Sequence, residues 1–160
     1  MMFGFGKKKI NFSAPCAGRI VPVAEVPDPM FSGKMLGDGY AVIPEEGADH
    51  LQVFAPADGT LVKVFKTGHA FSMKSTDGLE ILVHIGLETV ELKGKGFSVL
   101  KDSGEVKAGD PIVDVDLGVV REAQLNPITI VVFTKKGQLA DLTVNEGATS
   151  SKPAAVGTLA

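Results

Sequence analysis

Cysteine is nearly absent from this chain of 160 residues, because Cys16 is the only one. A single thiol cannot form an intramolecular disulfide, so nothing points to an oxidising compartment and we expect a cytoplasmic protein. Long apolar runs are absent too. No uninterrupted stretch approaches the roughly 20 residues that cross a bilayer, and residues 1–10 lack the apolar core of a signal peptide. These absences predict a soluble protein without strong membrane binding.

An excess of basic charge is also missing. The chain has 16 Lys and Arg against 19 Asp and Glu, which gives a net charge of -3, and its only dense basic run is 7–9. Three charges beside a chain terminus are typical of a solvated tail, whereas nucleic-acid binding needs a larger basic patch. We therefore expect no nucleic-acid partner. A single domain and a monomer are the default for a chain of this length.

Glycine and proline are abundant by contrast, with 19 and 9 residues that are spread along the chain instead of clustered. The short runs between them are rich in Val, Ile, Leu and Phe, which is typical of strands. They are 20–26, 61–65, 79–85, 111–115 and 128–133. Only 117–124 has a pattern compatible with a short helix. The sequence therefore predicts an all-β fold, either a sandwich or a barrel.

One hairpin motif occurs twice. Segment 14–23 (APCAGRIVPV) is similar to segment 55–64 (APADGTLVKV). In each copy a proline is unsuited to the centre of a sheet, a glycine permits a turn, and an alternating apolar strand follows. Neither copy carries a side chain with useful chemistry, so we interpret the duplicated hairpin motif as a packing device.

The ends of the chain differ in composition from the middle. We predict a flexible N-terminal tail over 1–9 and one folded domain over 10–148. The last segment, 149–160, is half Ser, Ala and Gly, contains one Lys and one Pro, and lacks periodicity. Such a composition is typical of disorder, so we predict a disordered C-terminal tail there.

The three histidines are the most informative polar residues. His50 lies before a predicted strand and is expected to be an ordinary surface or turn residue. His69 and His84 flank the turn sequence 75–78, and a hairpin folded there could bring both imidazoles to one face. The apolar surroundings of His84 are equally typical of a packed core histidine, and its own context does not decide between the two.

The neighbours of these two histidines suit a phosphohistidine. An imidazole nitrogen attacks phosphorus only when it is neutral, and the product needs hydrogen-bond donors for its anionic oxygens. Thr67 and Ser72 supply hydroxyls on either side of His69, and Gly86 allows close approach of the backbone beside His84. An apolar rim would limit water and slow hydrolysis.

Two segments carry a resemblance to a known family. Residues 67–72 (TGHAFS) and 83–97 (VHIGLETVELKGKGF) closely resemble the signature of the glucose-type enzyme IIA family of the bacterial sugar phosphotransferase system. Segment 29–39 resembles the family as well, and the similarity covers about 10–147. The resemblance implies an antiparallel β-sandwich with short helices. Glu88 departs from the Asp of several relatives, which affects no reacting group.

By this resemblance His84 accepts a phosphoryl group on Nε2 from the histidine phosphocarrier protein and donates it to a cysteine of a sugar-specific IIB domain. It implies that His69 stabilises the phosphoryl group and that Thr67 orients His69. No cofactor is implied. An apolar ring for docking partners would consist of Met30, Phe31, Leu36, Phe65, Leu82 and Val90. We expect a charge at Phe31 or Val90 to weaken docking without unfolding the domain.

Two other classes of protein stay open from the residues alone. His69 and His84 with an Asp or Glu could bind zinc as a catalytic centre, although no His-Glu-x-x-His motif is present, and incidental zinc between the two imidazoles is a further reading. The Ala-Pro hairpins and Met73-Lys74 are similar to biotinyl or lipoyl carriers. However, Ser72 and Ser75 replace the usual flanking context, and the chain is about twice the length that such a carrier needs.

Overall fold

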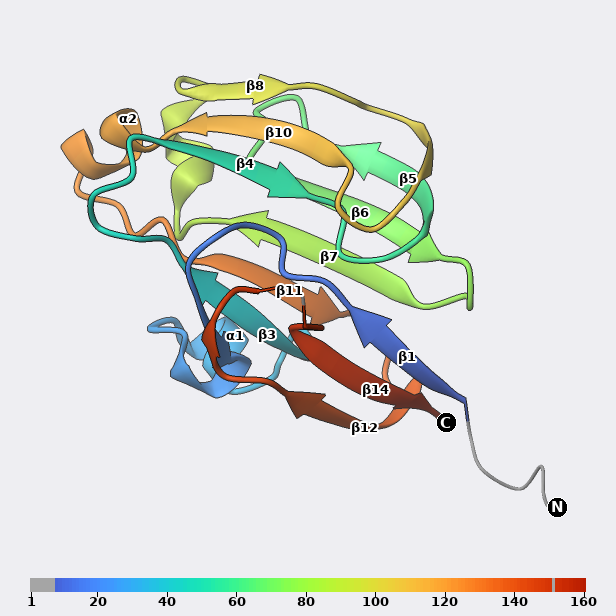
Figure 1. The fold of residues 1–160 in the computed structure, drawn as a ribbon. Helices are drawn as coiled ribbons and strands as arrows, with labels where there is room; N and C mark the ends of the chain where they lie inside the picture. Colours follow the sequence, from blue (N-terminus) through green and yellow to red (C-terminus); the bar gives the residue numbers. More distant parts are fainter. Residues whose placement is uncertain (1–7, 151) are drawn as a thin grey trace, which may run out of the picture.

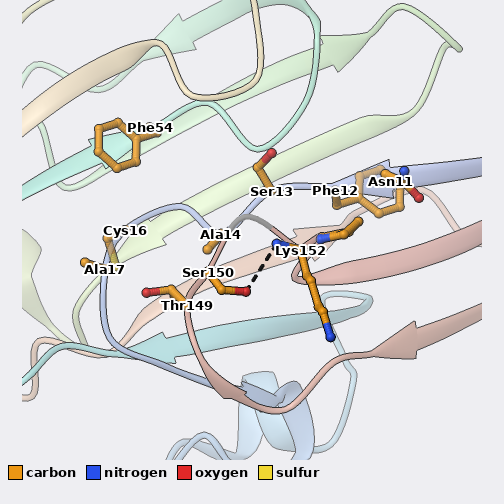
Figure 2. A pocket seen from close by; sticks show the side chains of 11 residues that line it. Asn11, Phe12, Ser13, Ala14, Cys16, Ala17, Phe54, Thr149, Ser150 and Lys152 are labelled. Carbon is orange, nitrogen blue, oxygen red and sulfur yellow. Dashed lines mark hydrogen bonds between the residues drawn. The ribbon is translucent and has the colours of Figure 1, made fainter.

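Short antiparallel strands dominate the computed structural model, which describes residues 8–150 and 152–160 (Figure 1). The largest sheet has eight strands, in the spatial order β13 (Gly147–Ala148), β2 (Arg19–Pro22), β3 (Asp38–Ile43), β11 (Thr129–Phe133), β7 (Glu80–Ile85), β6 (Ala70–Ser75), β5 (Gly59–Val64) and β9 (Gly104–Val106). A three-stranded sheet has the order β4 (His50–Phe54), β10 (Pro111–Asp116) and β8 (Phe97–Val99). Another has the order β1 (Lys9–Phe12), β14 (Ala155–Leu159) and β12 (Leu139–Val144).

The helices are short. Within residues 8–150 and 152–160 they are two 3-10 helices, η1 (Val23–Glu25) and η2 (Thr89–Leu92), and two α-helices, α1 (Pro29–Ser32) and α2 (Leu117–Glu122). Among the described residues, no helix has the length and apolar character needed to cross a membrane. The predicted helix over 117–124 is confirmed by α2, and the antiparallel β-sandwich with short helices is confirmed as the fold class.

The two smaller sheets pack against one face of the eight-stranded sheet (Figure 1). Alternate residues of the central strands, such as Ile81, Val83 and Ile85 of β7, point into this interface and are buried. Phe12 of β1 and Val113 of β10 meet them from the opposite layer. Each such side chain, when fully buried, stabilises the fold by roughly 1.5–3 kcal/mol, so this interface is the main core.

The other face of the eight-stranded sheet carries a second apolar cluster. Strand β11 is buried along its whole length because Val131 and Phe133 point into the main core while Ile130 and Val132 point outwards. Segment 23–36, which contains η1 and α1, covers the outward residues. The buried members of this outer cluster are Val21, Val23, Val26, Phe31, Ala41, Ile128, Ile130 and Val132.

The duplicated motif places a glycine where two strands approach closely. A Cβ on Gly18 would lie 2.2 Å from the carbonyl oxygen of Ile43, and a Cβ on Gly59 would lie 2.1 Å from that of Lys74. Gly59 begins β5 and pairs with Ser75 of β6, whereas Gly18 directly precedes β2, whose first residue Arg19 pairs with Ile43 of β3. The motif therefore serves packing, as interpreted from the sequence, and the glycine is required chiefly by lack of space.

The predicted strands are confirmed within a few residues, apart from the first. The run 20–26 ends as a strand at Pro22, and η1 follows. The apolar residues Val23 and Val26 were therefore assigned to the wrong element. They are buried in the outer cluster, which explains why their run looked like a strand.

The prediction of a disordered tail over 149–160 is wrong for its second half. Strand β14 lies in the middle of its sheet and pairs with β1 on one side and β12 on the other. Its backbone groups are thereby satisfied on both edges, and Ala155 is fully buried although its side chain is small. Of the predicted tail over 1–9, Lys9 begins β1. Residues 1–7 lie outside the described residues.

Candidate functional site

His84 lies near the end of β7, on the outer face of the eight-stranded sheet. It pairs with Ile130 of β11 and with Ala70 of β6, so it shares this face with the outer cluster. The phenyl ring of Phe31 lies against the imidazole, with ring centroids 5.4 Å apart. His84 is partly exposed, so it is not sealed in the core as a packing residue would be.

His69 reaches the same place from the connection between β5 and β6. A turn closes this connection, because Gly68 N donates to Phe65 O over 2.8 Å and Gly68 has φ 73°. The backbone of His69 then runs beside β7, where its carbonyl oxygen accepts from Ile85 N over 2.7 Å. The centroids of the His69 and His84 rings are 5.3 Å apart at an interplanar angle of 79°. The structure therefore brings the two predicted histidines together.

The contacts of His84 determine which of its nitrogens is free. Its Nδ1 lies 2.7 Å from the carbonyl oxygen of Gly86. A carbonyl oxygen only accepts, so Nδ1 carries the proton and Nε2 keeps its lone pair. Burial lowers the pKa of His84 below its ordinary value, and the Gly86 hydrogen bond and the charge of Asp28 oppose that shift. A neutral imidazole with a free Nε2 is the form that can act as a nucleophile.

His69 is more buried than His84, with 6% of its surface exposed. Burial lowers its pKa, and so does the charge that His84 would carry when protonated. Thr67 Oγ1 forms a hydrogen bond with His69 Nδ1. This bond fixes the orientation of the ring and leaves its Nε2 side to interact with a bound group. Thr67, His69 and His84 thus form one connected site, as expected from the sequence.

The six predicted docking residues differ in exposure. Met30 on α1 and Val90 on η2 are 45% and 50% exposed, whereas Phe31 is only 5% exposed. Leu36, Phe65 and Leu82 are half-buried, and the ring of Phe65 meets that of His69 edge-on at 5.3 Å between centroids. Because Phe31 belongs to the outer cluster, a charge there would cost stability, contrary to the expectation from the sequence.

Two groups at the site were not assigned a role from the sequence. The Gly86 carbonyl is a backbone atom, so only its position in space reveals what it binds. Asp28 lies close enough to His84 to affect its pKa, and it caps α1 by accepting from Met30 N over 2.9 Å. Asp28 before Pro29 is a helix-start signature, and this signal could have placed Asp28 beside the apolar segment.

The remaining candidates lie elsewhere or lack partners. His50 is exposed on β4, in a different sheet from the histidine pair, as expected for a surface residue. No group of three or more His, Cys, Asp and Glu side chains suited to a metal ion exists within 8–150 and 152–160, so the zinc-enzyme alternative lacks a third ligand there. Lys74, the residue of the carrier alternative, lies within β6 between two paired strands and not in a turn.

Comparisons with known proteins agree with this geometry. The family described as phosphoenolpyruvate-dependent sugar phosphotransferase system, EIIA 1, matches residues 10–139. The PTS system glucose-specific EIIA component of Bacillus anthracis is 40% identical over 154 residues, which covers 94% of this chain and 91% of the relative. The PTS system glucose-specific EIICBA component of Staphylococcus carnosus is 47% identical over 122 residues, which covers 76% of this chain and 18% of that longer protein. The solved structure of glucose permease IIA from Mycoplasma capricolum has a TM-score of 0.78 and 37% identity, and the match covers 93% of this chain and 96% of that one.

Proposed function

The chain belongs to the EIIA 1 family of the phosphoenolpyruvate-dependent sugar phosphotransferase system, and on this premise we propose that it carries a phosphoryl group on His84 Nε2 during sugar uptake. The observation that supports this most directly is the hydrogen bond from His84 Nδ1 to Gly86 O. It keeps the proton on Nδ1, so that Nε2 is the nitrogen with a lone pair. A second imidazole lies beside that ring.

The relay has two steps. First, the Nε2 lone pair attacks the phosphorus of a phosphorylated histidine phosphocarrier protein, and the donor's N–P bond breaks with its electron pair left on the donor imidazole. Second, a thiolate of a IIB domain attacks the same phosphorus, and the pair of the Nε2–P bond returns to His84. The proton on Nδ1 stays in place throughout. Positioning and charge are therefore what the protein contributes, as is usual in phosphoryl transfer.

His69 stabilises the phosphoryl group in this proposal, and Thr67 orients His69. If the Thr67 hydroxyl donates to Nδ1, the proton of the neutral imidazole is on Nε2, where it can donate to a phosphoryl oxygen. Both imidazoles have lowered pKa values, so both are neutral at pH 7 and neither step needs a prior deprotonation. No metal ion takes part in either step.

The partners dock around the histidines in this proposal. Exposed apolar side chains at Met30 and Val90 and half-buried ones at Leu36, Phe65 and Leu82 offer a surface that excludes water from the phosphoryl group. We further propose that the protein works in the cytoplasm as a monomer, where it meets the phosphocarrier protein and the IIB domain of a glucose-type transporter.

Mass spectrometry after incubation with phosphoenolpyruvate, enzyme I and the phosphocarrier protein tests the proposal. We expect an acid-labile adduct of about 80 Da on the wild-type chain and none on His84→Ala. His50→Ala is the matched control because His50 is exposed on another sheet, and it should take up the adduct normally. An adduct on His84→Ala, or none on the wild type, would refute the proposal.

A further inference from the structure

A buried hydroxyl near the histidine pair has no part in the relay described above. Thr89, the first residue of η2, is 1% exposed. Its Oγ1 donates to the carbonyl oxygen of Ile85 over 2.5 Å. Because Ile85 lies four residues earlier, this bond closes a loop whose intervening residues are 86–88. Gly86, whose carbonyl holds the His84 ring, is the first of these residues.

This loop has an unusual backbone that needs support. Gly86 and Glu88 both have positive φ angles, 76° and 60°. A left-handed conformation at a residue with a Cβ is uncommon and persists where the surroundings hold it. On one side the loop is held by the segment before β11, since Gly86 N donates to Ile128 O over 2.8 Å and Leu87 N donates to Asn126 O over 2.9 Å. Thr89 closes it at its far end.

Thr89 acts on the loop with both parts of its side chain. A Cβ built on Gly86 would lie only 2.5 Å from Thr89 Cγ2, so the methyl group covers the Cα of Gly86. The hydroxyl meanwhile fixes the peptide that joins Ile85 to Gly86, through the Ile85 carbonyl. The peptide that follows carries the Gly86 carbonyl oxygen. Its direction toward His84 Nδ1 therefore depends on how this short loop is held.

We propose that Thr89 is a positioning residue for phosphoryl transfer, whose hydroxyl, through its hydrogen bond to Ile85 O, holds the Gly86 carbonyl oxygen in place against His84 Nδ1. This inference rests on the proposed function of His84. When the carbonyl is held, the proton stays on Nδ1 and Nε2 is free to attack. When the Gly86 carbonyl oxygen moves out of hydrogen-bond distance of Nδ1, the tautomer with the proton on Nε2 becomes populated. That tautomer has no lone pair at the reacting nitrogen.

Two variants separate the hydroxyl from the methyl group. Thr89→Val keeps the shape and loses the donor, whereas Thr89→Ser keeps the donor and loses the methyl group. Nitrogen-15 NMR of the unphosphorylated protein reports which ring nitrogen of His84 carries the proton. We expect Thr89→Val to shift the tautomer ratio of His84 by about tenfold, since one hydrogen bond changes an equilibrium by roughly that factor. Thr89→Ser should keep the Nδ1–H tautomer.

Single-turnover phosphorylation gives the second readout. Thr89→Val should accept phosphoryl groups about tenfold more slowly than the wild type, because small displacements of a reacting group are costly. Thr89→Ser should stay within about twofold on the same grounds. Thermal melting of both variants shows that they are folded.

Three results would overturn the inference. The first is a wild-type tautomer ratio in a folded Thr89→Val, and the second is a wild-type rate in that variant. The third is loss of the Nδ1–H tautomer in Thr89→Ser. If Thr89→Val does not fold, this measurement on Thr89→Ser is by itself the test of the inference. Failure of the wild-type chain to accept phosphoryl groups would refute the proposed function instead, and the tautomer ratios would still test the role of Thr89.

Discussion

At the residue scale, the strand pairing that brings His69 and His84 together also buries them, which lowers the pKa of each imidazole. Burial is the largest cause of the lowered pKa of each imidazole, and in His69 the charge of a protonated His84 adds to it. The two rings therefore disfavour each other's protonated form at 5.3 Å between centroids. In the proposed relay, the histidine site thus gains its readiness to react from the burial that keeps the imidazoles neutral.

The lowered pKa values predict a pH-dependent stability. An unfolded histidine binds a proton near pH 6.5, whereas His69 and His84 bind it in the folded state only at lower pH. The unfolded state therefore gains protons first on acidification, and the free energy of unfolding falls as the pH drops from about 6.5 through the two folded pKa values. Urea titrations at a series of pH values measure this loss.

The double variant His69→Gln/His84→Gln is the reference for that measurement. It lacks both titrating groups, so its free energy of unfolding should fall less between about pH 7.5 and pH 5 than that of the wild type. Above pH 7.5 the two proteins should show parallel curves, because both imidazoles are neutral there in the folded and unfolded states. Equal slopes over the acidic range would contradict the linkage.

At the scale of elements, β14 shows how a segment of small residues becomes part of a sheet. It supplies the middle strand between β1 and β12. Gly157 faces Phe12 and Leu139, because a Cβ there would lie 3.0 Å from an atom of each. Small residues in the last segment thus give space to large side chains of the flanking strands. The segment has few large side chains of its own, and those of the neighbouring strands fill the space around it.

Proline in the middle of β14 should weaken the fold. Val156 pairs with Asn11 of β1 and Thr143 of β12, so Val156→Pro would disrupt the pairing of the central strand. We expect the free energy of unfolding to fall by about 2 kcal/mol or more, since proline has no N–H for the ladder and its ring disturbs a strand that is paired on both sides. Chemical denaturation measures this change. Val156→Thr keeps the backbone N–H and a β-branched side chain, and should stay close to the wild type. An unchanged midpoint in the proline variant would mean that β14 does not stabilise the domain.

Strands were predictable from the sequence where the local pattern decides the structure. The runs around Leu61, Ile81, Val113 and Val131 are short, apolar and bounded by turn residues, and each lies in the main core or crosses between the two clusters. The apolar run was misleading at Val26, which was predicted to lie in a strand. It lies in segment 23–36, which covers the sheet and buries its apolar residues against it, so the run looks like that of a strand. The local pattern did not predict β14, which is held in its sheet by β12 and by β1, a strand from the other end of the described chain.

The candidate site was predictable to a different extent. The turn at 75–78 and the family-like segments around His69 and His84 were enough to expect that the two histidines meet. Which nitrogen of His84 is free could not be predicted, because it is set by a hydrogen bond to the backbone carbonyl of Gly86. Every residue has such a carbonyl, so the sequence does not show where it points. Likewise, Thr89 lies in the family-like segment 83–97, but the role of its hydroxyl could not be predicted from the sequence. That role depends on the fold of the loop 86–88, which the hydroxyl closes.

At the scale of the whole molecule, the proposed docking surface combines exposed and buried apolar residues. Val90 is exposed, and Phe31 belongs to the outer cluster that covers the large sheet. In the proposed relay, the same face of the protein therefore has two roles. Its exposed residues would contact partners, while its buried residues hold segment 23–36 and one wall of the histidine site in place.

Substitutions at these two positions should separate docking from stability. Val90→Asp should change the free energy of unfolding by no more than about 0.5 kcal/mol, as is usual for surface positions. Its KM for the phosphorylated donor protein should rise about tenfold, because a charge replaces an apolar contact. Phe31→Ala should lower the free energy of unfolding by roughly 3 kcal/mol, since it leaves a cavity. Denaturant titration measures the free energy of unfolding of each variant, and phosphorylation rates at several donor concentrations give its KM. A collapse of stability in Val90→Asp would contradict this division.

The pairing of the first and last strands has a consequence for joining this domain to another chain. Lys9 at the start of β1 lies opposite Thr158 near the end of β14, and Figure 1 shows this corner at a distance from α1 and from the end of β7 that carries His84. A linker attached at this corner would leave the face that carries His69 and His84 uncovered. A tethered IIB domain would then meet that face at an effective concentration in the millimolar range, set by linker length and not by new contacts.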